Sequence, residues 1–195
     1  KMTEKQKDIY YISAETKDQA LASPHLEGFK SKKIPVLIMT DAIDQFWLPM
    51  VGSFKEKKFT SITQGQINLD DLDEKNKDKK KDDKNEKEKK DKEYVDLVAQ
   101  LKVVLGDQVK DIRLSSKLTD SPVCLVADEG DMDIAMEQLM AQRDTNYKGA
   151  PRILEINGDH SLIKNMKSLL SKKEDNDLVS DAGTLLFEQA RLMEG

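Results

Sequence analysis

Short apolar runs alternate with amphipathic segments in the first third of the chain. Residues Ile9–Ile12 form a short apolar run rich in strand-forming side chains. Residues Ile34–Met39 form a continuous apolar run, which is typical of a strand covered on both faces. Because a helical segment lies between the two runs, we expect Ile9–Ile12 to pair in parallel with Val36–Met39.

Helix signals flank the second of these strands. The helical segment before it has Thr16 as a candidate N-cap and is broken or restarted at Pro24. Residues 41–54 are predicted to form another helix, and residues 57–63 a short third strand. The order strand, helix, strand, helix predicts a small βαβα unit.

A long charged stretch follows, without an apolar residue between Leu72 and Tyr94. Side chains four residues apart are mostly like-signed up to Asp82 and mostly opposite-signed from Asp83 onward. Each favourable pair contributes only a few tenths of a kcal/mol, but six in series favour a helix. This helix would continue into a stripe of apolar residues at helical spacing: Tyr94, Leu97, Val98, Leu101, Val104 and Leu105.

We therefore expect one helix from about Asp83 to Leu105, ended by Gly106. The preceding residues 70–82 are predicted to be a mobile charged joint between two domains, residues 1–69 and residues 83–195. A binding arm that acts through its charge remains the alternative for this stretch.

A second α/β unit is predicted after Gly106. Its strand candidates are residues 109–115, 122–128 and 152–157. Its helix candidates are residues 130–144, with Asp131 or Asp133 near the start, 159–173, capped by Asp159 or Ser161, and 176–195. The fold class is therefore α/β (α+β), with two small units.

Charge and composition narrow the function classes. The formal net charge of −5 argues against a nucleic-acid partner, which usually requires a basic face. No apolar run approaches the length that crosses a membrane, so no membrane partner is expected. The single cysteine, Cys124, cannot form an internal disulfide, which fits a reducing compartment.

Catalytic signals are weak. No glycine-rich phosphate loop and no cysteine–histidine cluster with metal spacing occurs, so we expect no catalytic, cofactor or metal site in this chain. An enzyme that uses Cys124 or His160 remains a minor alternative, because a nucleophile needs a base within hydrogen-bond reach. His25 and His160 are expected to be structural.

Two apolar features suggest contact with other proteins. Phe46 and Trp47 are adjacent, so both cannot easily point into one narrow core, and exposed aromatic residues mark interaction sites. The second feature is a stripe at helical spacing: Met132, Met136, Leu139 and Met140. On the residues alone, a core role for this stripe is favoured over a surface that holds varied apolar partners.

Several stretches together resemble one family, the bacterial branch (HtpG) of the ninety-kilodalton heat-shock chaperones. They are KDIYYISAET, SPHLEGFKSKKIPVLIMTDAIDQFW, VKDIRLSSKLTDSPVCLV, EINGDHSLI and LLFEQARLMEG, in the family's order. The resemblance implies the end of a middle domain followed by a C-terminal dimerisation domain, with a short mixed sheet covered by helices. It also implies an ATP-dependent homodimer in the cytoplasm, whose ATP and Mg sites and hydrolysis lie outside this chain.

The resemblance also implies site residues. Contact with non-native client proteins would fall on two groups: Gln45, Phe46, Trp47 and Pro49, and Met132, Met136, Leu139 and Met140. The family dimerises through a bundle of its last two helices, of which this chain holds the first; the residues concerned are Leu185, Leu186, Gln189 and Met193. An assembly module with client binding elsewhere is the alternative function.

Overall fold

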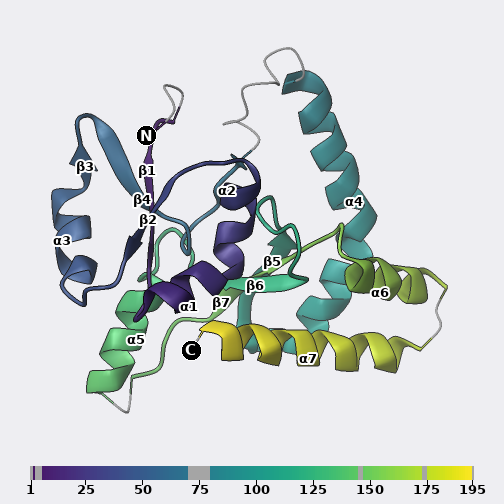
Figure 1. Ribbon diagram of the computed structural model, residues 1–195. Coiled ribbons are helices and arrows are strands. Elements are labelled where there is room, and N and C mark those ends of the chain that lie inside the picture. The colour runs from purple at the N-terminus through teal and green to yellow at the C-terminus, as the bar shows by residue number, and fades with distance from the viewer. Residues whose placement is uncertain (1, 3–5, 70–79, 145–146, 173–174, 195) are drawn as a thin grey trace.

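The computed structural model describes residues 2, 6–69, 80–144, 147–172 and 175–194, and of residues 80–88 the backbone alone (Figure 1). Two sheets, each with its own helices, lie side by side along the chain. This arrangement confirms the predicted α/β (α+β) class with two units. Five of the six ion pairs predicted between Asp83 and Glu93 involve side chains outside the described part. In the sixth, Lys89–Glu93, the Glu93 carboxylate pairs with Lys167 at 2.7 Å.

The first unit is built on a four-stranded sheet of order β2-β1-β4-β3. Its strands are β1 (Ile9–Ser13), β2 (Val36–Met39), β3 (Ser53–Phe54) and β4 (Lys57–Ser61). The predicted parallel pairing is confirmed, with Tyr11 opposite Leu37. The helix predicted over residues 41–54 was wrong at its end, because Gly52 adopts φ 66° and Ser53–Phe54 form β3, which pairs antiparallel with β4 through a tight turn.

Helices cover the two faces of this sheet unequally (Figure 1). On one face lie α1 (Lys17–Ala22), the 3-10 turn η1 (Pro24–Leu26) and α2 (Glu27–Ser31). The predicted N-cap is confirmed, because the Thr16 side chain accepts a hydrogen bond from the Gln19 N–H, and Pro24 starts the 3-10 turn. On the other face α3 (Asp44–Val51) packs the Trp47 ring edge-on against Phe59, 5.8 Å between centroids.

Strand β2 is less covered than its sequence predicts. A strand covered on both faces was expected, but Leu37 is 46% exposed on one face. The strand also lies at the edge of the sheet. Val36 and Ile38 do pack against the buried cluster around Tyr10 and Phe29. A run of apolar side chains therefore does not by itself show that both faces of a strand are covered.

The second unit begins with the long helix α4 (Lys80–Leu105), which starts three residues before the predicted Asp83. Gly106 adopts φ 49° and ends the helix as predicted, and the 3-10 turn η3 (Gly106–Gln108) follows. Of the predicted mobile joint, residues 70–79 lie outside the described residues, and residues 80–82 are helical. The predicted domain boundaries remain a prediction.

A three-stranded sheet of order β5-β7-β6 forms the centre of this unit. Strand β5 (Val109–Leu114) is parallel to β7 (Arg152–Ile156), and β6 (Val123–Val126) is antiparallel to β7. Its main core joins these strands to α4, α6 (Ser161–Ser171) and α7 (Asn176–Glu194). A Cβ at Gly183 would lie 2.3 Å from Leu101 Cδ2, so a larger residue would force the Leu101 side chain to move where α7 crosses α4.

Two helix starts test the predicted caps. Asp133 caps α5 (Ile134–Arg143), where its carboxylate accepts from the Ala135 N–H at 3.0 Å. Helix α6 is capped by His160, whose Nδ1 accepts from the Leu162 N–H at 3.2 Å, so the prediction of Asp159 or Ser161 was wrong. Asp159 pairs instead with Lys90 of α4.

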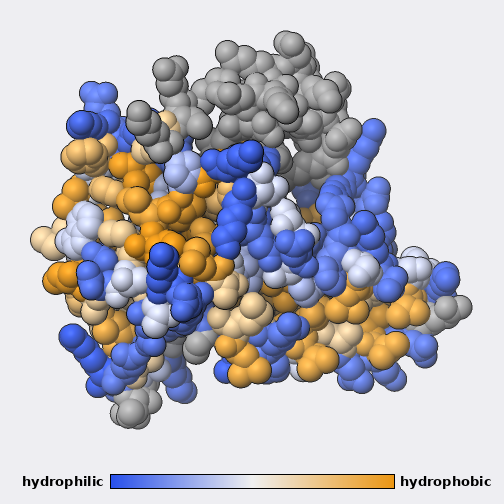
Figure 2. Space-filling view, in the orientation of Figure 1, coloured by the Kyte–Doolittle hydropathy of each residue, from blue (hydrophilic) through white to orange (hydrophobic). Residues whose placement is uncertain are grey.

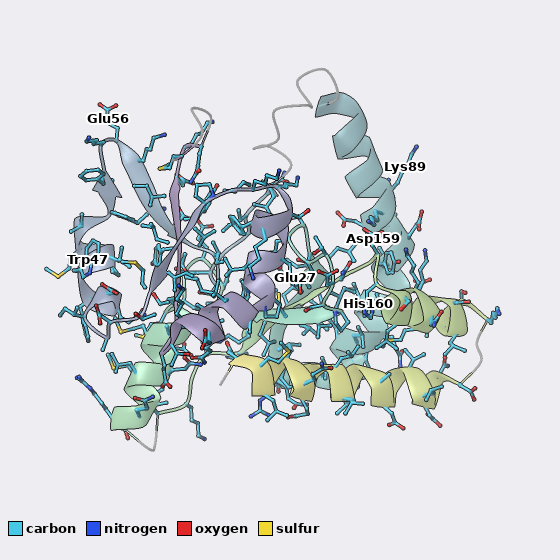
Figure 3. The ribbon with its side chains drawn as sticks, in the orientation of Figure 1. Glu27, Trp47, Glu56, Lys89, Asp159 and His160 are labelled. Carbon is cyan, nitrogen blue, oxygen red and sulfur yellow. The ribbon has the colours of Figure 1, made fainter. Side chains whose placement is uncertain are left out.

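The two units contact each other through hydrogen bonds between side chains of one unit and backbone groups of the other. The Glu27 carboxylate accepts from three successive N–H groups, Thr119, Asp120 and Ser121, and from the Ser121 hydroxyl; it lies between the units in Figure 3. Burial alone would raise the pKa of Glu27, but these hydrogen bonds lower it. Gln64 and Ala127 also form a parallel bridge between the units.

Charged groups are buried at the same junction. Glu155 of β7 is 3% exposed, and its carboxylate accepts from Arg113 at 2.8 Å and from the Ser115 hydroxyl at 2.9 Å. Lys117 is 2% exposed; its Nζ lies 3.8 Å from the Glu155 carboxylate and donates to the Ile62 carbonyl at 2.9 Å. Arg113 also donates to the Gly65 carbonyl at 2.8 Å. The cations paired with Glu155 therefore hold the first unit.

His25 is a titratable group of this junction. Burial and the nearby charge of Lys117 lower the pKa of His25 well below 6.5, although a hydrogen bond to the Leu125 backbone opposes the shift. Its Nδ1 has no hydrogen-bond partner among the described residues. The folded chain therefore holds this ring neutral where the unfolded chain would protonate it.

We expect the folded state to lose stability as the pH falls below about 6.5, because only the unfolded chain then binds a proton at His25. Between pH 7 and pH 5.5 this site alone should cost about 1 kcal/mol of unfolding free energy. Urea unfolding at both pH values measures it. The His25→Gln variant should show a smaller pH dependence than the wild type, and an equal pH dependence would contradict the assignment.

Candidate functional site

Helix α3 anchors its tryptophan rather than exposing it. The Asp44 carboxylate accepts from the Trp47 Nε1–H at 2.7 Å and from the Asp41 N–H at 3.2 Å. Trp47 is half-buried against Phe59 as a result. Of the other predicted residues here, Gln45 and Phe46 are half-buried and Pro49 is exposed.

The most exposed apolar side chains around α3 were not predicted. They are Ile43 (63% exposed), Met50 (86%), Val51 (53%) and Phe54 (57%), and we call them the α3 patch. A signal was available, because Ile43, Trp47 and Met50 follow the three-and-four spacing of one helix face. Sequence reasoning weighted the aromatic pair and overlooked the aliphatic residues on each side of it.

A strained turn carries Phe54 of this patch. Lys55 and Glu56 both have positive φ, 48° and 63°, as a two-residue hairpin turn requires, although neither is glycine or asparagine. The Lys55 ammonium lies 5.4 Å from the centre of the Phe54 ring. Glu56 marks the tip of this hairpin in Figure 3, at the outer end of the first unit, on the same side as Trp47.

Helix α5 presents part of the predicted methionine stripe. Met136, Leu139 and Met140 are half-buried, and the fully buried side chains of this helix are Ile134 and Glu137. Met132 is 40% exposed but precedes the N-cap Asp133, so it does not share a helix face with the others. The three half-buried residues, with Met132 beside them, form what we call the α5 patch.

Buried ion pairs fix the position of α5. Glu137 lies 2.7 Å from Arg152 of β7 and accepts from the Ala150 N–H at 3.2 Å. Arg152 also pairs with Glu194 at the end of α7, at 3.2 Å. Burial raises the pKa of Glu194 even though Arg152 opposes this shift. A groove of about 750 Å³ lies between α5 and the end of α7, with Tyr147 and Leu192 among its walls.

The outer face of α7 carries a regular apolar stripe. Leu178, Leu185 and Leu192 follow one another every seventh residue and are 54%, 71% and 83% exposed. Figure 2 shows apolar side chains gathered along this helix. Of the predicted dimerisation residues, Leu185, Gln189 and Met193 are exposed, while Leu186 is buried in the core and is not part of this face.

The residues of the minor enzyme interpretation are not brought together. Cys124 is buried in β6, and burial raises the pKa of its thiol well above the usual range, so it is held protonated and inert. A small cavity of about 70 Å³ between the units is lined by Cys124, His25 and Ser13. His160 caps α6 instead.

Among the described residues, no group of three or more histidine, cysteine, aspartate or glutamate side chains could hold a metal ion. Within the same ranges, none of the helices has the length and apolar character to cross a membrane.

Comparison with known proteins matches residues 1–195 to the family described as Hsp90 protein. The chain is 42% identical to the chaperone protein HtpG of Roseobacter denitrificans, over 98% of this chain and 31% of that protein. It is 38% identical to HtpG of Wolbachia pipientis wMel and 40% identical to HtpG of Psychromonas ingrahamii, over the whole chain in both cases. These matches span 30% and 29% of those two proteins.

The chain therefore spans about three tenths of the length of these relatives. The family match covers every residue, and the identity to each of these relatives exceeds one third. The chain belongs to the Hsp90 family of molecular chaperones.

Proposed function

We propose that this chain is the end of the middle domain and the C-terminal domain of an HtpG-type chaperone, where it contacts client proteins and supports dimerisation. The observation that carries the proposal is the pair of apolar surfaces, the α3 patch and the α5 patch, in a chain that belongs to the Hsp90 family. ATP and Mg binding and ATP hydrolysis are assigned to other parts of a longer cytoplasmic protein, so this chain itself is not an enzyme.

The mechanism that we propose is holding. Partly folded proteins expose apolar segments, and these would lie against flexible methionine side chains that adapt to many shapes. Met50 is 86% exposed and Met132 is 40% exposed, so both are free to rearrange around a partner. In a homodimer, two such surfaces would face one client, and effective concentration would strengthen individually weak contacts.

The outer stripe of α7 supports the dimerisation part of the proposal. Three leucines exposed every seventh residue occupy one of the two apolar positions of the heptad repeat through which helices pair in bundles. A stripe of this kind is costly to leave in water, and a helix of a second chain would cover it. The alternative function, an assembly module with client binding elsewhere, rests on this stripe alone.

One prediction from this proposal concerns the client surfaces. Met136→Ser with Met140→Ser, or Ile43→Ser with Met50→Ser, should weaken the suppression of client aggregation about fivefold, equivalent to about 1 kcal/mol of lost apolar contact. Light scattering of a heat-denatured client at increasing chaperone concentration measures this effect.

The matched control is Val103→Ser with Val95→Ser, which removes two exposed apolar side chains from α4. The control should suppress aggregation as well as the wild type does. Unchanged suppression in both test variants would favour the assembly module. Loss of helical circular dichroism in the methionine variant would show instead that the α5 patch is core.

A separate prediction concerns the exposed face of α7. In the longer protein, Leu185→Lys with Leu192→Lys should convert the dimer to a monomer, because two charges would enter an apolar seam. Sedimentation velocity measures the change, and Val103→Lys is the control for added surface charge. A dimer that survives both substitutions would contradict the assignment of this face.

A further inference from the structure

Strand β2 combines two properties that proteins usually keep apart. Its four residues, Val36–Met39, are all apolar, yet it lies at the end of its sheet with β1 as its only neighbour among the described strands. Figure 2 shows a broad apolar area over the part of the first sheet where β1, β2 and β4 overlap in Figure 1. Edge strands normally carry charges, prolines or bulges that prevent further pairing, and an apolar edge strand is a template for another strand.

The register shows which backbone groups face outward. The Met39 carbonyl accepts from the Ala14 N–H of the β1 side at 3.1 Å, and Met39 pairs with Ser13. Successive residues of a strand point their backbone N–H and C=O groups to opposite sides. The backbone groups of Leu37 and Met39 therefore form their hydrogen bonds with β1. The N–H and C=O groups of Val36 and Ile38 therefore point away from the sheet.

The side chains of β2 leave this edge accessible. Val36 and Ile38 pack inward against the core of the first unit. Leu37 points to the opposite face and is 46% exposed. An added strand would therefore gain main-chain hydrogen bonds from Val36 and Ile38, and an apolar contact with Leu37.

Exposed charges of opposite sign flank the edge. Lys33 precedes β2 and has φ 56°, a left-handed conformation that breaks the chain just before the strand. Asp41 follows β2 and is also exposed. A strand that runs antiparallel to β2 would fit best with a basic residue at its N-terminal end, beside Asp41, and an acidic residue at its C-terminal end, beside Lys33.

The size of the edge decides between two occupants. A second copy of the chain could pair its own β2 in the same way, with the charges matched. Four residues of strand, however, extend only about 13 Å. The surface buried along so short an edge is far smaller than the roughly 1,200 Å² that holds two folded proteins together. A short extended segment can pair along an edge of this length, and weak, rapidly reversible binding is sufficient for it.

We propose that the outer edge of β2 binds extended apolar segments of client proteins by strand addition, antiparallel to β2. This inference rests on the proposed function and specifies its substrate class: segments of alternating apolar residues with an unpaired backbone, with a basic residue before them and an acidic residue after them. The edge of β2 would recognise the backbone and the end charges of a client segment, whereas the α3 and α5 patches would bind apolar side chains in any backbone conformation.

Amide hydrogen exchange measured by NMR tests strand addition residue by residue. The probe is a short peptide of alternating valine and threonine, with lysine at its N-terminus and glutamate at its C-terminus. Excess peptide should slow exchange at Val36 and Ile38 about tenfold or more, while Leu37 and Met39, which are already bonded to β1, should change little. The same peptide with a central proline, or with its end charges exchanged, should protect these amides less.

The Leu37→Lys variant should abolish this protection, because it removes the apolar contact that Leu37 offers and places a charge beside the added strand, while Val103→Lys on α4 should retain it. Equal protection of all four amides, or none, would overturn the proposal. Protection that grows with protein concentration without peptide would also overturn it, and would identify a second copy as the occupant.

The edge and the proposed function can fail separately. If Leu37→Lys leaves peptide protection intact while the α3 and α5 variants lose client suppression, the edge inference fails and the proposed function stands. If the peptide protects Val36 and Ile38 but those variants suppress aggregation normally, strand addition stands and the patches lose their role.

Discussion

Glu155 places a buried carboxylate on the middle strand of the smaller sheet. The relative position of the two units depends on the hydrogen bonds and ion pairs that this carboxylate forms. Arg113 and Ser115 donate to it, and Lys117 lies beside it. Each cation also donates to a backbone carbonyl of the first unit, at Gly65 and at Ile62. Removing one partner of such a buried set typically costs about 3–5 kcal/mol, because the remaining charge stays buried without compensation.

This junction explains why the apolar surfaces have fixed places. The α3 patch belongs to the first unit and the α5 patch to the second, and helix α5 is itself held by the Glu137–Arg152 ion pair. Buried contacts fix the two helices, while the α3 patch stays exposed and Met136, Leu139 and Met140 of the α5 patch stay half-buried. Trp47 illustrates the same division, since its bond to Asp44 anchors α3 while Ile43 and Met50 remain in water. A chaperone that binds varied partners needs flexible apolar side chains on a rigidly positioned helix.

Local signals carried most of the fold. The parallel pairing of β1 with β2, the Thr16 cap, the Gly106 stop and the apolar stripe of α4 were all predicted, because each depends on neighbouring residues or on one helix period. The edge position of β2 was not predicted, since it depends on which strands come to lie beside it.

The candidate site was predicted less completely for the same reason. The apolar patterns on α3, α5 and α7 can be recognised in the sequence, but the exposure of individual residues depends on tertiary contacts. Leu186 faces the core and Met132 precedes the helix start, and neither fact follows from spacing alone. The buried set around Glu155 also had no sequence signal, because Arg113, Lys117 and Glu155 come from separate segments.

The most direct test of the account is urea unfolding of the Glu155→Gln variant followed by two probes. Trp47, the single tryptophan, reports on the first unit, and far-ultraviolet circular dichroism reports mainly on the long helices of the second. The wild type should give coincident transitions, because the junction makes the units unfold together. In the variant the tryptophan transition should separate from the helical one. Coincident transitions in the variant, at any urea concentration, would contradict the claim that Glu155 couples the two units.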